Sequence, residues 1–240
     1  MSALTPAIKA QLEQVSVATV TTTLYKRGLR NQLIQGVYPV GKGKTSRMIG
    51  PAFTLRYMPA REDLNELAVF RDRAHPQRKA VEECPPGAVM VMDSRKDGRA
   101  ASAGGILVTR LQQRGVAGVV TDGGFRDSPE IAQLDIPAYH HNPAPPTNLT
   151  HHQAIAINEP IGCGDAPVFP GDIIFGDEEG VVVIPAHLVQ EVAQEAFEMT
   201  AFEDFVTEKV REGRSILGLY PATDPATLPE FEAWRKQHGR

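Results

Sequence analysis

The sequence has few cysteines, and this scarcity excludes two kinds of scaffold. Cys84 and Cys163 are the only two in 240 residues, and they form no C-x-x-C pair or other metal-ligand spacing. Disulfide frameworks need a dense set of cysteines, and structural zinc sites need ligands at short, fixed spacings. We therefore expect both cysteines to be reduced residues that pack in the interior.

Long apolar runs and an excess of basic charge are also missing. No stretch approaches the roughly 18 apolar residues of a membrane-spanning helix, so we predict no membrane segment and, by default, a cytoplasmic location. The chain has 25 basic and 29 acidic residues, a net charge of -4 and a pI near 6.0. Such a chain lacks the positive field that binds phosphates, which disfavours nucleic acid as a partner.

The residues that are present suffice for one large core. Hydrophobic residues make up 42% of the 240 positions, which favours a globular protein. We predict a single domain over residues 1–220. Residues 221–240 carry three prolines, at 221, 225 and 229, and we expect them to form a C-terminal arm outside the core.

The order of patterns along the chain predicts a mixed α/β fold. Apolar positions at helical spacing predict one or two helices over 6–27 and a long helix over 186–213. A βαβ unit follows from strands within 85–94 and 118–123 that flank a helix over 104–115, which ends at Gly115. Short apolar runs between Gly-Asp and Pro-Gly turns over 154–185 predict an antiparallel β meander.

The βαβ unit predicts a crevice for an anionic ligand. Ligands of α/β folds gather where parallel strands end and helices begin, and a helix start offers unpaired N–H groups. Here one end provides the run "SAGGIL" and the other provides Asp122, Arg126 and Asp127. Each feature has a simpler interpretation: glycines for close packing, an exposed Arg-Asp ion pair, and Asp122 as an acceptor of turn N–H groups.

Three segments carry a longer signature: "GPAFTLR" (50–56), "GGILVTRLQQRGVAGVVTDGGFRD" (104–127) and "PGDIIFGDEEGVVVIP" (170–185). Together they resemble the RraA-like family, which includes 4-hydroxy-4-methyl-2-oxoglutarate aldolases and the regulator of RNase E activity, over about residues 15–220. The resemblance implies a swivelling ββα domain. It also implies a homotrimer or homohexamer whose active site lies between subunits.

The resemblance implies roles for individual residues. The carboxylate of a 2-oxo acid would be held by four main-chain N–H groups, those of Gly104, Gly105, Ile106 and Leu107. Arg126 would contact the keto oxygen, and Asp127 would bind Mg²⁺ or Mn²⁺. Glu203 aligns near the place where a neighbouring subunit supplies an acid.

These residue types fit lyase chemistry on a 2-oxo acid. A 2-oxo acid chelates a hard divalent cation, for which carboxylate ligands are suited. When the bond to C3 breaks, negative charge develops on the keto oxygen, where a guanidinium and a cation stabilise it. No lysine lies within the signature motif, and this route needs no Schiff base.

The sequence departs from the aldolase pattern at one position. Aldolases of the family carry an acid where this chain has Gly105, and this acid helps to hold water on the metal. Glu130 stands three residues after Asp127 and would reach the same ion if the segment turns helically. The alternative is that Glu130 is an ordinary first-turn acid favoured by the helix dipole.

Two adjacent histidine pairs, His140 with His141 and His151 with His152, offer another candidate for a metal site. Adjacent side chains in an extended segment point to opposite sides, so we expect neither pair to form a metal site.

Two functions remain open from the sequence. The first is a metal-dependent lyase that releases pyruvate by retro-aldol cleavage, decarboxylates oxaloacetate, or does both. The second is a non-enzymatic regulator of a ribonuclease that acts by binding another protein. The retained Arg126 and Asp127 favour the enzyme, because a regulator needs neither residue.

Overall fold

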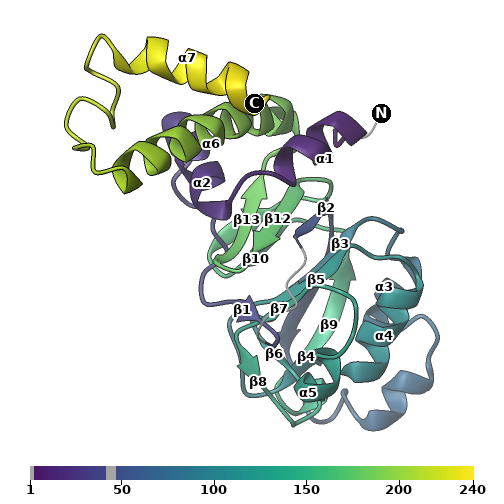
Figure 1. Ribbon diagram of the computed structural model, residues 1–240. Coiled ribbons are helices and arrows are strands. Elements are labelled where there is room, and N and C mark those ends of the chain that lie inside the picture. The colour runs from purple at the N-terminus through teal and green to yellow at the C-terminus, as the bar shows by residue number, and fades with distance from the viewer. Residues whose placement is uncertain (1–2, 42–46) are drawn as a thin grey trace.

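The computed structural model describes residues 3–41 and 47–240, so residues 1–2 and 42–46 of the predicted 1–220 domain lie outside the described residues. Figure 1 shows a sheet that extends through two lobes, with the chain termini in the upper lobe. The helices are α1 (Pro6–Leu12), α2 (Val17–Lys26), η1 (Leu67–Arg71), α3 (Pro76–Glu83), α4 (Gly105–Gln113), α5 (Ser128–Ile131), η2 (Asn148–Thr150), η3 (Ala186–Leu188), α6 (Val189–Arg211) and α7 (Thr227–His238).

The strands form one large sheet and two small ones. They are β1 (Tyr38–Pro39), β2 (Met48–Pro59), β3 (Val89–Asp93), β4 (Ala101–Ala103), β5 (Gly118–Thr121), β6 (Gly124–Phe125), β7 (Ala138–His140), β8 (Asn142–Pro143), β9 (His152–Ile157), β10 (Ile161–Cys163), β11 (Ala166–Val168), β12 (Ile173–Asp177) and β13 (Gly180–Ile184). The large sheet has the order β1-β7-β5-β3-β2-β12-β13, and β9 also pairs with β2.

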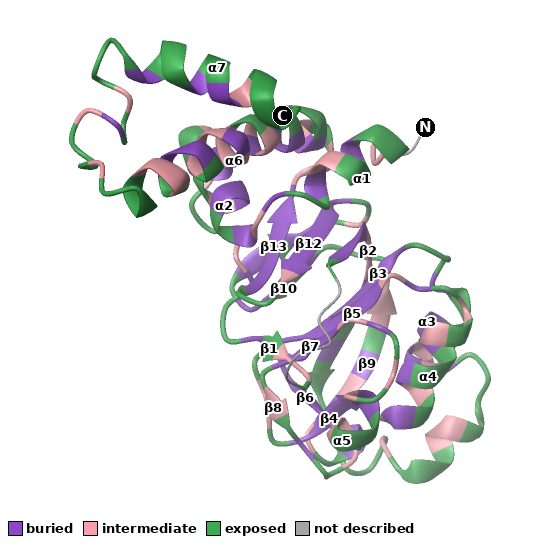
Figure 2. Cartoon of the chain, in the orientation of Figure 1, coloured by how far each residue is buried: buried purple, intermediate pink, exposed green. Residues whose placement is uncertain are grey.

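The predicted βαβ unit is present around the middle of this sheet. β3 and β5 are parallel neighbours, with Val89 opposite Gly118, and α4 lies between them along the chain. Every residue of β3 and β5 is buried (Figure 2), as expected for parallel strands covered on both faces. The helix ends as predicted, because Gly115 adopts a left-handed φ of 74° just after it.

The predicted meander is also present. β10 and β11 form one antiparallel hairpin and β12 and β13 form another. β12 also pairs antiparallel with β2. In the upper lobe (Figure 1), α1, α2 and α6 pack against β12 and β13 through a buried cluster that includes Leu12, Val20 and Phe175.

The C-terminal tail differs from the predicted arm. It contains α7, which lies against α6 (Figure 1) and buries Phe231 and Trp234 in a cluster with Phe205. Pro229 does not interrupt this helix, because it stands in the first turn, where its missing N–H has no partner to lose. The prolines therefore delay the start of the helix and leave the rest of the tail free to pack.

Within the described residues, no helix is long and apolar enough to cross a membrane. Both cysteines are free and buried, as expected.

Candidate functional site

A small three-stranded sheet brings the two predicted loops together. Its order is β4-β6-β8, with Ala103 opposite Phe125, and the Arg126 N–H donates to the Ala103 carbonyl at 3.1 Å. We predicted that the ends of the main βαβ strands would do this directly. In the structure a loop over 94–100 separates β3 from β4, and the parallel β4–β6 pair sets the two loops side by side.

The start of α4 has two open main-chain donors. The Gly105 N–H donates to Asp127 Oδ2 at 3.1 Å, and the Leu107 N–H donates to the Gly104 carbonyl at 3.0 Å. The N–H groups of Gly104 and Ile106 donate to no atom of the described residues. Of the four predicted donors, these two are free to bind an anion, and the positive end of the helix dipole favours one there.

Arg126 and Asp127 lie directly beside these donors. Arg126 Nε is 3.7 Å from Asp127 Oδ2, and the two side chains are 47% and 38% exposed. Asp127 adopts the left-handed conformation, with φ 57° and ψ 31°, at the residue before α5. Aspartate adopts this conformation more readily than most residues, and here it turns the chain into α5.

Gly104 is required where this loop meets Arg126 and Asp127. A Cβ at position 104 would lie 2.6 Å from Arg126 Cγ and 2.9 Å from Asp127 Oδ2, so any side chain there would displace both of these groups. Position 105 is only slightly less confined, because a Cβ there would lie 3.2 Å from Glu130 Oε2 and 3.3 Å from Asp127 Cβ. The two glycines let the main-chain donors approach these side chains.

A cavity of about 220 Å³ contains this arrangement. A cavity of this volume suits a small molecule. The cavity is lined by Phe70, Gln77, Arg78, Ala101, Ala103, Gly104, Ile106, Leu107, Arg126, Asp127, Thr147 and Asn148. No lysine is among these lining residues.

Apart from Ala101, which directly precedes the run "SAGGIL", five lining residues were not predicted from the sequence: Phe70, Gln77, Arg78, Thr147 and Asn148. They come from η1, α3 and the approach to η2, far along the chain from the signature motif. Pro76 following His75 is a signal for a helix start, which would have located α3. Nothing in the sequence indicates that this helix faces the cavity.

Two side chains hold the main chain that leads into α4. The Tyr57 hydroxyl donates to the Ser102 carbonyl at 2.6 Å, and Gln77 Nε2 donates to the same oxygen at 2.7 Å. Ser102 is itself buried, two residues before the open Gly104 donor. The pair anchors the peptide that leads to these donors.

Asp122 has the simpler of its two predicted roles. It is buried, and it accepts the N–H groups of Ser94, Lys96 and Gly164 at 2.7, 3.1 and 3.1 Å. Burial raises the pKa of its carboxyl, and the N–H donors oppose part of that rise. Asp122 therefore stabilises the turn after β5 through these hydrogen bonds. It does not line the cavity.

The oxygen donors suit a hard divalent cation. A Cβ at position 105 would lie 3.2 Å from Glu130 Oε2 and 3.7 Å from Asp127 Oδ2, so both carboxylates lie beside Gly105, although only Asp127 lines the cavity. In the part of the chain that the structure describes, no three His, Cys, Asp or Glu side chains cluster as a complete metal site. Mg²⁺ needs no such cluster, because it commonly keeps several waters and binds one or two carboxylates together with its substrate.

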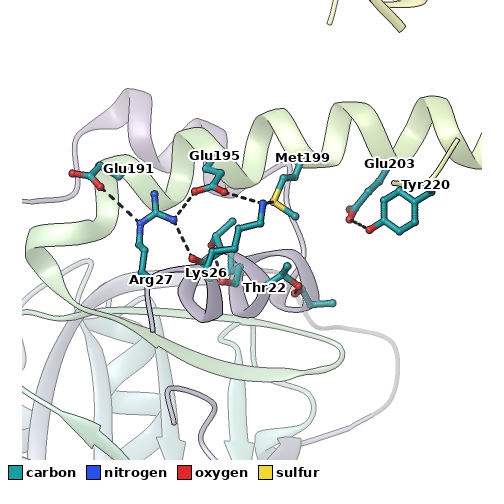
Figure 3. Close-up of polar contacts among 11 residues, drawn as sticks. Thr22, Lys26, Arg27, Glu191, Glu195, Met199, Glu203 and Tyr220 are labelled. Atoms are coloured by element: carbon teal, nitrogen blue, oxygen red, sulfur yellow. Dashed lines mark hydrogen bonds and ion pairs between the residues drawn. The ribbon is translucent and has the colours of Figure 1, made fainter. Parts of the chain in front are cut away.

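Glu203 lies elsewhere in its own chain. It is in α6, where its carboxylate accepts from the Thr19 hydroxyl at 3.2 Å and from the Tyr220 hydroxyl at 3.1 Å. Figure 3 shows Glu203 pointing to Tyr220, on the same side of α6 as Glu195 and its partners Lys26 and Arg27. Its predicted role requires a second copy of the chain.

The histidine pairs alternate as expected. His140 and His152 are buried against Phe125 and Tyr57, and His141 is exposed. No histidine lines the described cavity.

The fold is that of an α/β protein with a cavity between a helix start and an Arg-Asp turn. The chain belongs to the RraA-like family, whose model, described as Aldolase/RraA, matches residues 17–183. The family predicted from the sequence is therefore confirmed.

Two relatives carry the name of an aldolase. A protein of Halalkalibacterium halodurans, provisionally named a 4-hydroxy-4-methyl-2-oxoglutarate aldolase, is 33% identical over 172 residues, or 70% of this chain and 73% of that protein. A protein of the same provisional name from Burkholderia mallei is 31% identical over 148 residues, or 59% of this chain and 77% of that protein.

Solved structures of the family share the fold. Streptomyces coelicolor RraAS2, described as an unusual member of the RNase ES inhibitor RraA protein family, matches with a TM-score of 0.73 and 28% identity over 84% of this chain and 96% of that one. The RNA-processing inhibitor RraA from Thermus thermophilis matches with a TM-score of 0.53 and 26% identity over 69% of this chain and 92% of that one. The predicted α/β fold class is confirmed.

Proposed function

We propose that the protein is a divalent-metal-dependent lyase that acts on small 2-oxo acids. The observation that carries this proposal is the meeting of two open N–H donors, Gly104 and Ile106, with Arg126 and Asp127 in one cavity of about 220 Å³. The aldolase names of relatives at 33% and 31% identity support the same class of reaction.

The main-chain donors and Arg126 have complementary tasks in this reaction. The open N–H groups at the start of α4 bind and orient the carboxylate of the 2-oxo acid. Arg126 donates to the keto oxygen, where negative charge develops as the bond to C3 breaks. Arg126 Nε lies 3.7 Å from Asp127 Oδ2, so its guanidinium is beside the carboxylate that would hold the cation.

Asp127, with Glu130, would hold Mg²⁺ or Mn²⁺ beside the same substrate oxygens. When bound, the cation supplies Lewis-acid stabilisation of the developing enolate charge. Asp127 already accepts the Gly105 N–H through Oδ2, which holds its carboxylate beside the start of α4.

The electron movement is the same for two types of substrate. In retro-aldol cleavage the C4 hydroxyl loses its proton and becomes a carbonyl as the C3–C4 bond breaks. The electron pair of that bond forms the enolate of pyruvate, which is then protonated at C3. In decarboxylation of oxaloacetate the bond from C3 to the carboxylate breaks and CO₂ leaves. The electron pair of that bond forms the same enolate of pyruvate. Glu203 of a neighbouring copy in a trimer or hexamer is our candidate for the acid that moves a proton.

Pyruvate release tests the proposal. Oxaloacetate and 4-hydroxy-2-oxo acids are supplied with Mg²⁺ or Mn²⁺, with an enzyme-free blank for metal-catalysed decarboxylation, and the assay is repeated with chelator. We expect turnover that stops with chelator and in Arg126→Ala and Asp127→Ala. Arg110→Ala is the matched control, because Arg110 pairs with Glu82 outside the cavity. Turnover that survives complete metal removal would contradict the mechanism.

The second candidate is a regulator of a ribonuclease that acts by protein–protein binding. The RraA proteins of Streptomyces coelicolor and Thermus thermophilis, described as inhibitors of RNase ES and of RNA processing, favour it through 28% and 26% identity. Absence of turnover on every 2-oxo acid, together with inhibition of a purified RNase E-type nuclease, would establish this candidate instead.

A further inference from the structure

The short strand β4 leads straight into the open donors of α4, and buried side chains from three other elements hold two of its carbonyl groups. The Ala101 carbonyl lies 3.3 Å from His152 Nε2 of β9. The Ser102 carbonyl accepts from Tyr57 of β2 and Gln77 of α3, at 2.6 and 2.7 Å. Long side chains therefore hold two consecutive peptides of a three-residue strand.

The third carbonyl of β4 shows how this strand sets the direction of a donor. Ala103 O and Gly104 N belong to one planar trans peptide, so the C=O and the N–H point in opposite directions. The Ala103 carbonyl accepts from the Arg126 N–H at 3.1 Å, which places the Gly104 N–H on the opposite side of the chain. A rotation of β4 about its own axis would turn both groups together. The direction of the Gly104 donor therefore depends on what prevents that rotation.

His152 is fully buried, and its contacts determine its protonation state. A carbonyl oxygen only accepts, so Nε2 carries the proton that is donated to Ala101. Nδ1 is buried and has no hydrogen-bond partner among the described residues, so a second proton there would be left unsatisfied. Burial lowers the pKa of His152, in agreement with a neutral ring. The ring also meets Tyr57 edge to face, with 4.9 Å between the centroids, so the two side chains support each other.

We propose that Tyr57 and His152 are positioning residues, which keep the open donors at the start of α4 aimed at the carboxylate of the 2-oxo acid by holding β4 in one orientation. Neither side chain lines the cavity, so their effect on a ligand passes through the main chain of β4. Gln77 is left out of this assignment, because it lines the cavity itself. The inference rests on the proposed function, because it assigns residues to the binding of its substrate.

Tyr57→Phe removes a single hydroxyl group and tests the proposal. Main-chain donors bind the carboxylate alike in the substrate and in the transition state, so their misalignment raises KM and leaves kcat almost unchanged. We expect KM for oxaloacetate to rise about three- to tenfold, the loss of about one hydrogen bond, with kcat within about threefold of wild type. Tyr139→Phe is the matched control and should keep the wild-type KM. The Tyr139 hydroxyl donates to the Asp177 carbonyl at 2.8 Å, away from the cavity.

A pair of substitutions tests His152. His152→Phe keeps an aromatic ring but removes the donor to Ala101, and we expect a similar rise in KM. His152→Gln restores an NH₂ donor and should bring KM back towards wild type. A purely structural role of the ring predicts the reverse order, because phenylalanine fills the space of histidine better than glutamine does. Wild-type KM in Tyr57→Phe or His152→Phe would overturn the proposal, and so would a loss confined to kcat.

Hydrogen exchange of the free protein examines β4 without any substrate. Main-chain amides over residues 101–107 should exchange faster in Tyr57→Phe and His152→Phe than in the wild-type protein, while those of β12 and β13 keep their rates. The unchanged strands would show that the variants are folded. Wild-type exchange over 101–107 in both variants would overturn the proposal, because the two side chains would then not hold this strand.

Failure of the proposed function has a different signature. If the wild-type protein cleaves no 2-oxo acid, the dissociation constant of pyruvate in Mg²⁺, measured by calorimetry, takes the place of KM. Weaker pyruvate binding in Tyr57→Phe and His152→Phe, with unchanged binding in Tyr139→Phe, would support the positioning role without lyase activity. Equal affinity in all four proteins, or no pyruvate binding by the wild-type protein, would overturn it.

Discussion

Replacing Gly104 with alanine should abolish most activity while leaving the fold intact. The new Cβ would lie 2.6 Å from Arg126 Cγ, and ordinary contacts begin at 3.4 Å, so Cγ must retreat by about 0.8 Å. Asp127 Oδ2, at 2.9 Å, must move as well. A displacement of about 1 Å in a catalytic group can cost about 100-fold in rate, and we expect a loss of this order in kcat/KM.

Protein stability should change little in this variant. Gly104 has φ -129° and ψ 178°, an extended conformation that alanine adopts without strain. Alanine also restricts the unfolded chain, which contributes about 0.4–1 kcal/mol, and the side chains that must move are partly exposed. The free energy of unfolding should therefore stay within about 1 kcal/mol of wild type. Gly104→Ala keeps the main-chain N–H, so a loss of activity would be due to the displacement of Arg126 and Asp127.

The assay is pyruvate release in saturating Mg²⁺, paired with a urea unfolding curve. Gly162→Ala is the matched control, because a Cβ there meets no atom within 4 Å and its φ is not left-handed. Wild-type kcat/KM in Gly104→Ala, with both variants equally stable, would refute the reasoning that these groups must keep their positions.

Three further predictions concern other parts of the molecule. Burial lowers the pKa of His140 from 6.5 to about 4, so the unfolded chain binds a proton before the folded one as the pH falls. Stability should fall by about 2–3 kcal/mol between pH 6.5 and 4, and His140→Gln should flatten this part of a pH series of urea curves. Phe231→Ala should lower the free energy of unfolding by about 3–4 kcal/mol, because Phe231 is buried in the cluster between α6 and α7. Leu228 is 55% exposed, and Leu228→Ala should lower it by less than about 0.5 kcal/mol. Equal effects of the two substitutions would mean that α7 is not part of the core. Glu130→Gln should raise the Mg²⁺ concentration needed for half-maximal activity about 10-fold; an unchanged value would mean that Glu130 is only a first-turn helix acid.

The elements whose periodicity was strong could be predicted from the sequence. The α4 helix, its glycine end at Gly115 and the buried strands β3 and β5 follow from local patterns that tertiary structure did not override. The convergence of Gly104, Arg126 and Asp127 was also predictable, because one supersecondary unit carries both loops. The pairing of β4 with β6 that brings these residues together could not be predicted, since strands of two or three residues leave almost no pattern in the sequence.

The far wall of the cavity could not be predicted. Arg78 and Asn148 are separated by 70 positions along the chain, and no local pattern states that α3 and η2 face the same space. The packing of α7 was missed for another reason. The prolines at 221, 225 and 229 indicated a broken tail, while Phe231 and Trp234, three residues apart, carried the helical signal that prevails in the structure.

The central claim is that the α4 donors and the Arg126–Asp127 turn hold one small chelating acid beside a divalent cation. A crystal structure with Mn²⁺ and oxalate, an analogue of the pyruvate enolate, tests it through the anomalous signal of manganese. The account predicts a manganese peak beside the Asp127 carboxylate and an oxalate oxygen within about 2.7–3.2 Å of the Gly104 or Ile106 nitrogen. Manganese and oxalate bound at any other surface, with this cavity empty, would contradict it.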